Sequence, residues 1–159
     1  SAVSPRVLIL GILCSVVADA DVIGFRFGVH YGSLLGHRGL THSIVFALLL
    51  AACLLFLARP PSRPSDIAAI FVFLFFSTLS HPLLDALTNG GMGVALFAPF
   101  DNQRYFFGFR PIEVSPIGVA SFFSARGWRV LQSEVRWIWL PSLAVGALGL
   151  AWKSLRAFL

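Results

Sequence analysis

The sequence predicts an all-α fold, an integral membrane helical bundle of about four transmembrane helices with a long aromatic and Arg-containing loop between helices three and four. The composition indicates this first: of 159 residues, 57% are hydrophobic and 12% are charged. That balance is too apolar for a soluble domain of this length. Four apolar stretches supply the helices, and chemistry-bearing polar residues gather at their ends. We expect residues 1–159 to form one membrane-embedded domain.

The first apolar stretch covers about residues 7–18, and Asp19 and Asp21 follow at its end. It is short for a span, which needs roughly 20 residues, unless other helices shelter its polar end. The two carboxylates can converge on a cation if the backbone leaves the helix at Gly24.

The second stretch covers residues 41–58, with Thr41 as the expected N-cap and His42 in the first helical turn. It stops at residues 59–64, Arg-Pro-Pro-Ser-Arg-Pro, because proline and charge do not continue an apolar helix. A tight polar turn is expected there.

The third stretch begins near Asp66, the expected N-cap, and continues to about residue 87, where Thr-Asn-Gly-Gly breaks it. His81 and Asp85 occupy its last two turns, and Pro82 between them is expected to disturb the helix. A long loop of about residues 89–136 follows. The fourth stretch, residues 137–152, has Trp near both ends, as interfacial anchors do.

Alternating direction through four spans places the end of the first helix, the start of the second and the end of the third on one membrane side. Ionisable groups at membrane depth are costly unless they are paired, hydrated or bound to metal, so such a cluster is a functional candidate. The net charge of +5 fits orientation-setting loops and does not require nucleic acid as a partner.

Asp19-Ala-Asp21 places two carboxylates where they can converge on a cation. Taken alone, the pair is more simply explained as polar residues that mark the water interface or cap a following turn.

The segment Gly-His-Arg-Gly-Leu-Thr-His-Ser, residues 36–43, holds two histidines and an arginine in a glycine-flanked turn. His42 is placed to coordinate a metal at the mouth of the bundle. His37 could do the same or be an interfacial, hydrogen-bonded histidine. Arg38 could bind substrate or simply set orientation.

His81 and Asp85 are four residues apart, which puts them on one helix face, one turn from each other. They can share a cation, and a helix-packing His-Asp pair is the equally weighted alternative.

Taken together, the three motifs favour a metal site. Mixed histidine and carboxylate ligands favour zinc, with manganese or iron as alternatives, over calcium or magnesium. More than three such ligands would suit two or more ions. The expected ligands are Asp19, Asp21, His37, His42, His81 and Asp85.

These motifs resemble the YdjM family of bacterial and archaeal membrane-bound, predicted metal-dependent hydrolases. The family order is D-x-D, then H-R-G-x-T-H-S, then S-H-x-x-x-D, then an aromatic and proline-rich loop bearing arginine. Here that loop runs through residues 96–100 to Arg104 and Arg110. The family is itself distantly similar to zinc-dependent phospholipase C and single-strand nucleases, which cleave phosphodiesters.

The resemblance implies a hydrolase of the cytoplasmic membrane that cleaves a phosphoester of a lipid or amphiphile with metal-activated water. Arg104 is the preferred anion-binding and catalytic group, and Arg38 and Arg110 are further substrate-binding candidates. Loop arginines at the lipid headgroups are their simpler interpretation. Asp101 is a candidate proton carrier, or merely a polar loop residue. The alternative function is a non-catalytic metal-binding sensor, carrier or scaffold.

The short loops and tails of the end without motifs are basic, which biases that end toward the cytoplasm. They carry one acid, Asp66, against Arg6, Arg59, Arg63, Lys153 and Arg156. The long loop on the other side is also basic, so the signal is mixed. Because short loops have more weight, we expect the metal site on the extracytoplasmic face.

Overall fold

The computed structural model describes residues 4–58 and 63–158, and all of its regular structure is helical apart from two isolated β-bridges. The described chain divides into two compact units. The first comprises Ser1–Leu87 and Met92–Gly108, and the second comprises Thr88–Gly91 and Phe109–Leu159. The expectation of a single membrane-embedded domain stays a prediction.

Helix α1, Pro5–Cys14, begins where sequence chemistry favours a start. Ser4 accepts a hydrogen bond from the backbone N–H of Val7 at 3.4 Å, and Pro5 occupies the first helical position. After a bend of 43° the chain continues as the 3-10 helix η1, Val17–Phe27. Gly28, at φ 78°, ends η1. The backbone therefore does not leave the helix at Gly24, because the 3-10 helix continues through it.

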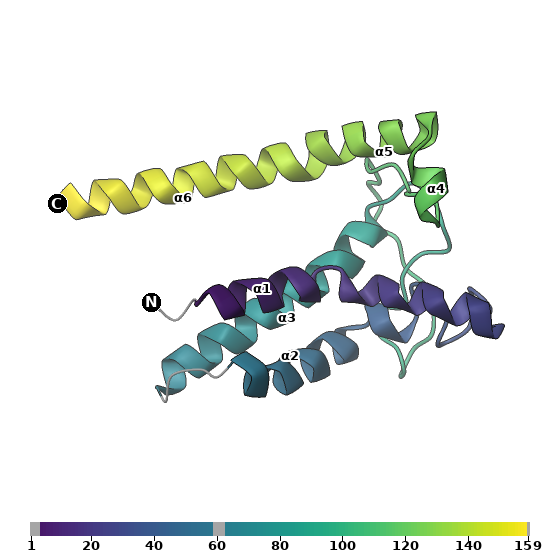
Figure 1. Cartoon of the computed structure of the whole chain (residues 1–159), viewed down its shortest axis with the longest axis horizontal. Helices are drawn as coiled ribbons and strands as arrows, with labels where there is room; N and C mark the ends of the chain where they lie inside the picture. The colour runs from purple at the N-terminus through teal and green to yellow at the C-terminus, as the bar shows by residue number, and fades with distance from the viewer. Residues whose placement is uncertain (1–3, 59–62, 159) are drawn as a thin grey trace. The chain divides into compact units, whose positions relative to one another are not determined.

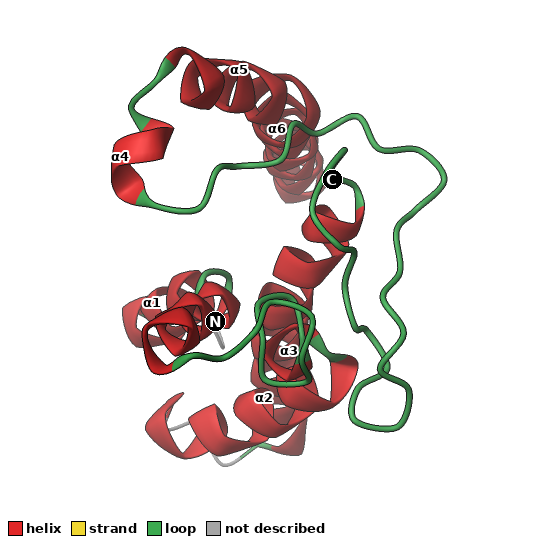
Figure 2. Ribbon diagram, turned by 90° about the vertical axis from the view of Figure 1, so that its right-hand side faces the viewer, coloured by secondary structure: helices red, strands yellow, loops and turns green. Residues whose placement is uncertain are grey.

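Helix α2, Ile44–Ala58, and helix α3, Pro64–Ala86, pack against α1 in the first unit (Figures 1 and 2). Small side chains at Ala47 and Ala51 are fully buried on α2, which lets its backbone approach its neighbours closely. Gly11 on α1 serves the same purpose, since a Cβ there would lie 2.5 Å from the Phe73 ring. The buried core comprises Val7, Cys14, Ala51, Ala58, Ile70 and Leu74.

Two helix starts differ from the sequence expectations. Ser43, not Thr41, caps α2, since its Oγ accepts from the Phe46 N–H at 3.0 Å. His42 consequently lies in the short 3-10 helix η2, Leu40–His42, before α2 begins. Helix α3 begins at Pro64, and Asp66 lies in its first turn, because proline fits the first helical position. The helix continues through Pro82.

The second unit contains α4, Val119–Phe122, and a long helix formed by α5, Ala125–Glu134, a π-helical turn η3, Val135–Trp139, and α6, Leu140–Phe158. The expected loop over residues 89–136 is thus wrong in its last part. A search for apolar runs misses α5, whose sequence ARGWRVLQSE is largely polar and begins at the Ser124 cap.

Two helices are long and apolar enough to cross a membrane, Pro64–Ala86 and Ala125–Arg156. The bent pair α1 and η1 makes a third if it counts as one span. Helix α2 is apolar but has 15 residues. A helical fold with apolar helices able to span a membrane is therefore confirmed, whereas the count of four spans stays a prediction. The turn expected at residues 59–62 lies outside the described residues.

Candidate metal centre

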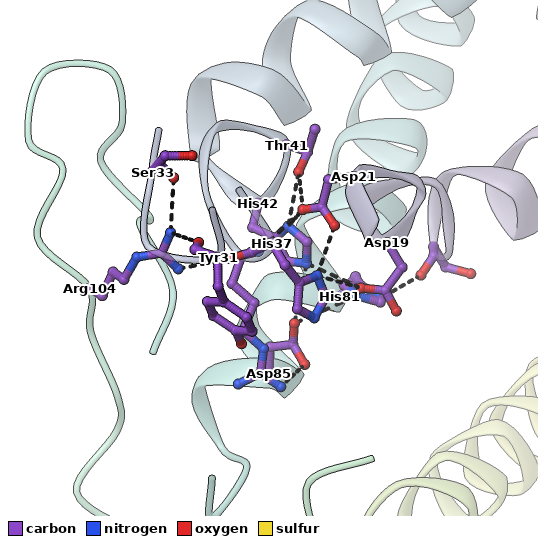
Figure 3. A network of polar contacts seen from close by, with 12 residues as sticks. Asp19, Asp21, Tyr31, Ser33, His37, Thr41, His42, His81, Asp85 and Arg104 are labelled. Carbon is purple, nitrogen blue, oxygen red and sulfur yellow. Dashed lines mark hydrogen bonds and ion pairs between the residues drawn. The ribbon is translucent and has the colours of Figure 1, made fainter. Parts of the chain in front are cut away.

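Three segments of the first unit bring the predicted ligands together at one end of its helices (Figure 3). Asp19 and Asp21 come from the start of η1, and His37 and His42 from the turn that leads into α2. His81 and Asp85 come from the last two turns of α3. All six side chains that the sequence singles out as ligands meet in this cluster, through contacts of 2.7–3.8 Å among themselves and with Arg38.

The glycines of the His-Arg-Gly turn allow the loop to close tightly behind the cluster. A Cβ at Gly36 would lie 2.2 Å from the carbonyl oxygen of His30, and one at Gly39 would lie 2.3 Å from that of Leu34. Arg38 between them has a left-handed φ of 62°. The turn therefore holds His37 and His42 on the same side, with their ring centroids 5.5 Å apart.

Four donor atoms form the tighter group, and they lie within 4.8 Å of one another: Asp19 Oδ1, His42 Nε2, His81 Nε2 and Asp85 Oδ2. His81 Nε2 is 3.1 Å from Asp19 Oδ1, and His42 Nε2 is 3.3 Å from Asp85 Oδ2. Two imidazole nitrogens and two carboxylate oxygens form a donor set that zinc, manganese and iron accept.

Three of these four side chains have a second contact with a protein group, through the atom that does not face the cluster. His42 Nδ1 is 3.2 Å from Asp21 Oδ2, and His81 Nδ1 donates to the Ser15 carbonyl at 2.9 Å. Because both partners only accept hydrogen bonds, the proton stays on Nδ1 and each Nε2 faces the cluster. Such outer partners orient metal ligands in proteins generally.

The third backing contact comes from Arg38, whose Nη2 donates to Asp85 Oδ1 at 2.7 Å. This leaves Asp85 Oδ2 directed at His42. Arg38 is buried at 4% exposure. Arg38 therefore lies against a candidate ligand carboxylate inside the fold.

A fit to a metal ion is supported by two buried atoms, the Nε2 nitrogens of His42 and His81. Neither makes a hydrogen bond of good geometry, although both are enclosed and carboxylate oxygens lie 3.1 Å and 3.3 Å away. Leaving a buried polar nitrogen unsatisfied is costly, and a cation between these nitrogens and the two carboxylates would remove that cost. The residues present fit a divalent metal.

The second group that could hold an ion comprises Asp21, His37 and His42. Here Asp21 is enclosed, with a side chain that is 2% exposed. Its Oδ1 is 2.8 Å from His37 Nδ1, and its Oδ2 accepts from the Thr41 hydroxyl at 2.8 Å and from the Arg38 N–H at 3.2 Å. His42 Nδ1 is a further neighbour of Oδ2, so both oxygens of the Asp21 carboxylate contact protein donors.

Charge in the metal-free cluster is balanced through His42. Burial alone would lower its pKa, but the surrounding carboxylates, Asp19 first, outweigh burial and raise it from 6.5 to about 10. The metal-free imidazole therefore carries a positive charge at neutral pH. A divalent ion would take over that role from the displaced proton.

Arg104 binds the backbone of the loop that carries His37. Its guanidinium donates to the carbonyl oxygens of His37 and Tyr31 at 2.9 Å and of Ser33 at 3.2 Å. It also lies over the Tyr31 ring, 5.6 Å from the centroid. These contacts join the loop after α3 to the His-Arg-Gly turn.

The remaining predicted residues are placed differently. Asp101 accepts from the Tyr105 hydroxyl and from the Gln103 N–H in an exposed turn, and Tyr105 lowers the pKa of Asp101. Arg110 belongs to the second unit, whereas the cluster lies in the first. Their proposed catalytic and substrate-binding roles stay predictions.

Thr41 and Ser15 are site residues that the sequence analysis missed. Thr41 acts through its hydroxyl on Asp21, and Ser15 through its carbonyl on His81. The H-R-G-x-T-H-S spacing contains a signal for Thr41, because a hydroxyl beside a candidate ligand histidine is a common outer partner. A backbone carbonyl leaves no such signal.

Comparisons with known proteins agree with the motifs. A family profile described as YdjM inner membrane protein matches residues 1–157. The inner membrane protein YbcI of Escherichia coli (strain K12) is 39% identical over 150 residues, which cover 94% of this chain and 85% of that protein. No solved structure matches the chain.

Proposed function

The chain belongs to the YdjM family of inner membrane proteins, and on that premise we propose that it is a membrane-embedded metal-dependent hydrolase. Its substrate is a phosphoester of a lipid or another amphiphile at the membrane interface. The ion is zinc, with manganese or iron as the alternatives that the same donors accept.

One observation carries the proposal: the four donor atoms Asp19 Oδ1, His42 Nε2, His81 Nε2 and Asp85 Oδ2 converge within 4.8 Å. Helix packing alone does not require two enclosed imidazole nitrogens to face two carboxylates. The outer contacts from Asp21, Ser15 and Arg38 support the same function, because they fix the direction of each donor.

The four ligands differ in exposure, and this difference indicates where a substrate would approach. The Asp19 side chain is 52% exposed, whereas those of His42, His81 and Asp85 are 0%, 18% and 16% exposed. Water and substrate would therefore reach the ion on the Asp19 side. When bound there, the ion would act as a Lewis acid and lower the pKa of a water molecule.

Arg38 is the residue of this chain best placed to hold a substrate anion beside the cluster. Its guanidinium binds one carboxylate, Asp85, at 2.7 Å, which places a positive charge beside the ligands, and guanidinium groups bind phosphate as well as carboxylate. His37 Nδ1 is 2.8 Å from Asp21 Oδ1 and 3.8 Å from Asp19 Oδ1, so its imidazole lies next to the exposed carboxylate.

The test combines metal analysis with a hydrolysis assay on protein purified in detergent and supplied with zinc. We expect the unmodified protein to retain the ion and to hydrolyse a phosphodiester lipid in mixed micelles. His42→Ala and His81→Ala should lose both properties. His30→Ala is the matched control, since His30 is exposed and outside the cluster.

Equal and low metal content in the unmodified protein, His42→Ala and His81→Ala would reject the metal centre. Retained metal without hydrolysis of any phosphoester lipid would reject the enzyme. That second result would favour the non-catalytic sensor, carrier or scaffold.

A further inference from the structure

Exposed apolar side chains, here called the apolar rim, continue from α1 past the cluster of candidate ligands onto η1. On α1 it includes Ile12, which is 67% exposed, and it continues with Val16, just before η1, which is 58% exposed. On η1 it includes Ile23 and Phe27, which are 57% and 81% exposed. The lipid-facing surface of the first candidate span therefore does not end at Asp19 and Asp21, where its long apolar run ends.

The turn before α2 and the loop after α3 also expose apolar side chains near the cluster. Leu35, two residues before His37, is 64% exposed, and Phe97 is 48% exposed. Phe97 is fixed near the ligands, because the neighbouring Ala95 N–H donates to the Arg38 carbonyl at 3.0 Å and the Leu96 carbonyl accepts from the Ile44 N–H at 2.9 Å. Loops that face water seldom expose so much apolar surface.

Helix lengths place the cluster within the thickness of a bilayer. The 15 residues of α2, which starts just after His42, rise about 22 Å. Along α3, the stretch from Pro64 to His81 rises about 26 Å. The hydrocarbon core of a membrane is about 30 Å thick. If the far ends of these helices lie at one membrane face, the ligands do not reach the opposite face.

Helix η1 covers the remaining distance. At the 3-10 rise, its stretch from Asp21 to Phe27 adds about 12 Å beyond the carboxylates. Figure 1 shows this segment continuing past the start of α2. Arg26, near its end, is exposed and long enough to extend to lipid headgroups.

We propose that η1 and the loops beside it are immersed in lipid, so that the metal centre lies below the bilayer surface and its ligand is a molecule that resides in the membrane. The acyl region of the bilayer covers the apolar rim, because the rim continues the exposed apolar side chains of α1. The cluster tolerates this depth since its charges are paired with one another.

This inference rests on the proposed function, because it assumes that the ligand of the metal centre is the substrate of that hydrolase. The test of membrane depth does not depend on activity. In a background of Cys14→Ala and Cys53→Ala, a spin label at Ile23→Cys or Phe27→Cys is measured in liposomes of phosphatidylethanolamine and phosphatidylglycerol. Relaxation by oxygen, which concentrates in lipid, is compared with relaxation by a water-soluble nickel chelate. Gln103→Cys is the matched control, an exposed polar position on the loop after α3.

We expect the ratio of oxygen to nickel accessibility to be several-fold higher at positions 23 and 27 than at position 103. A nickel accessibility at position 27 equal to that at position 103 would overturn the proposal. Low accessibility to both reagents would also overturn it, because protein and not lipid would then cover the apolar rim.

A hydrolysis assay separates this inference from the proposed function. Cleavage of a water-soluble phosphodiester at the rate of its lipid counterpart would leave the hydrolase standing and overturn the membrane-resident ligand. Cleavage of the lipid alone agrees with both.

Discussion

Arg38 and Asp85, separated by 47 positions in the sequence, are joined by a 2.7 Å contact between Nη2 and Oδ1. The same carboxylate directs its other oxygen at His42 Nε2, 3.3 Å away. Asp85 thus connects the buried Arg38 guanidinium with the candidate metal ligands. Its substitution distinguishes a role in metal binding from a role in helix packing.

Asp85→Asn is expected to lower metal affinity strongly while the protein still inserts and folds, because the amide keeps the shape of the side chain but not its charge. Metal titration of the purified variant measures this. Asp66→Asn, in the first turn of α3, is the control for loss of a carboxylate on that helix. Loss of membrane expression with metal content unchanged would indicate a helix-packing role instead.

Asp21→Asn should weaken metal binding by about 10–100-fold, the usual effect of losing an outer partner of a ligand. We treat Asp21 as an outer partner and not as a ligand because both of its oxygens already contact protein donors, namely His37, Thr41 and the Arg38 backbone N–H. Thr41→Val should act in the same direction with a smaller effect, which competition with a chelating dye can resolve. An ion count that drops from two to one in Asp21→Asn would instead make Asp21 a ligand of a second ion.

Metal binding should release a proton, and affinity should fall as the pH is lowered. His42 has a pKa raised to about 10 in the metal-free cluster, so it is protonated at neutral pH and the ion must displace that proton. The raised pKa stabilises the metal-free fold fully below pH 6.5, and this contribution is lost as the pH rises through about 10. Calorimetry in buffers of different ionisation enthalpy counts the proton, and His30→Ala should give the unmodified value.

Arg104→Gln should lower the thermal stability of the first unit, because three carbonyl oxygens lose a charged donor. Each hydrogen bond to a charged group contributes about 1.5–3 kcal/mol. Differential scanning fluorimetry measures the loss, with the exposed Arg26→Gln as control. If Arg104 is instead the anion-binding group, melting will be unaltered and only the KM for the phosphoester will rise.

Sidedness is tested by single cysteines at Ser65 and Gln103, in the background that lacks Cys14 and Cys53. Both positions are exposed, one in the first turn of α3 and the other beside Arg104. An impermeant maleimide applied to intact cells should label position 103 and not position 65, since the basic short loops favour the cytoplasm for the latter. The reverse pattern would place the metal centre on the cytoplasmic face.

The sequence was sufficient for the apolar helices and for the composition of the cluster, because both depend on local patterns. Apolar runs predict α2 and α3, and their direction brings the ends that carry His42 and His81 together. The 3-10 helix η1 was not predictable, since its residues alternate apolar with acidic and basic ones in no 3.6-residue pattern.

The division of labour within the cluster also required the structure. Asp19 and Asp21 look equivalent in sequence, yet their side chains are 52% and 2% exposed. Likewise, Arg104 contacts the His37 carbonyl across 67 positions, and no spacing rule links the two. Tertiary packing decides such roles, and a single sequence does not encode them locally.

The exposure of Asp19 has a consequence for how the protein would acquire its ion. Since three candidate ligands are held by the folded chain and the fourth faces outward, rotation of one side chain would be sufficient to open the coordination sphere of a bound ion. Loading could then follow insertion into the membrane, and the ion would exchange while the helices stay packed. The rate at which a chelator strips the ion from the native protein should consequently depend on position 19 far more than on the stability of the bundle.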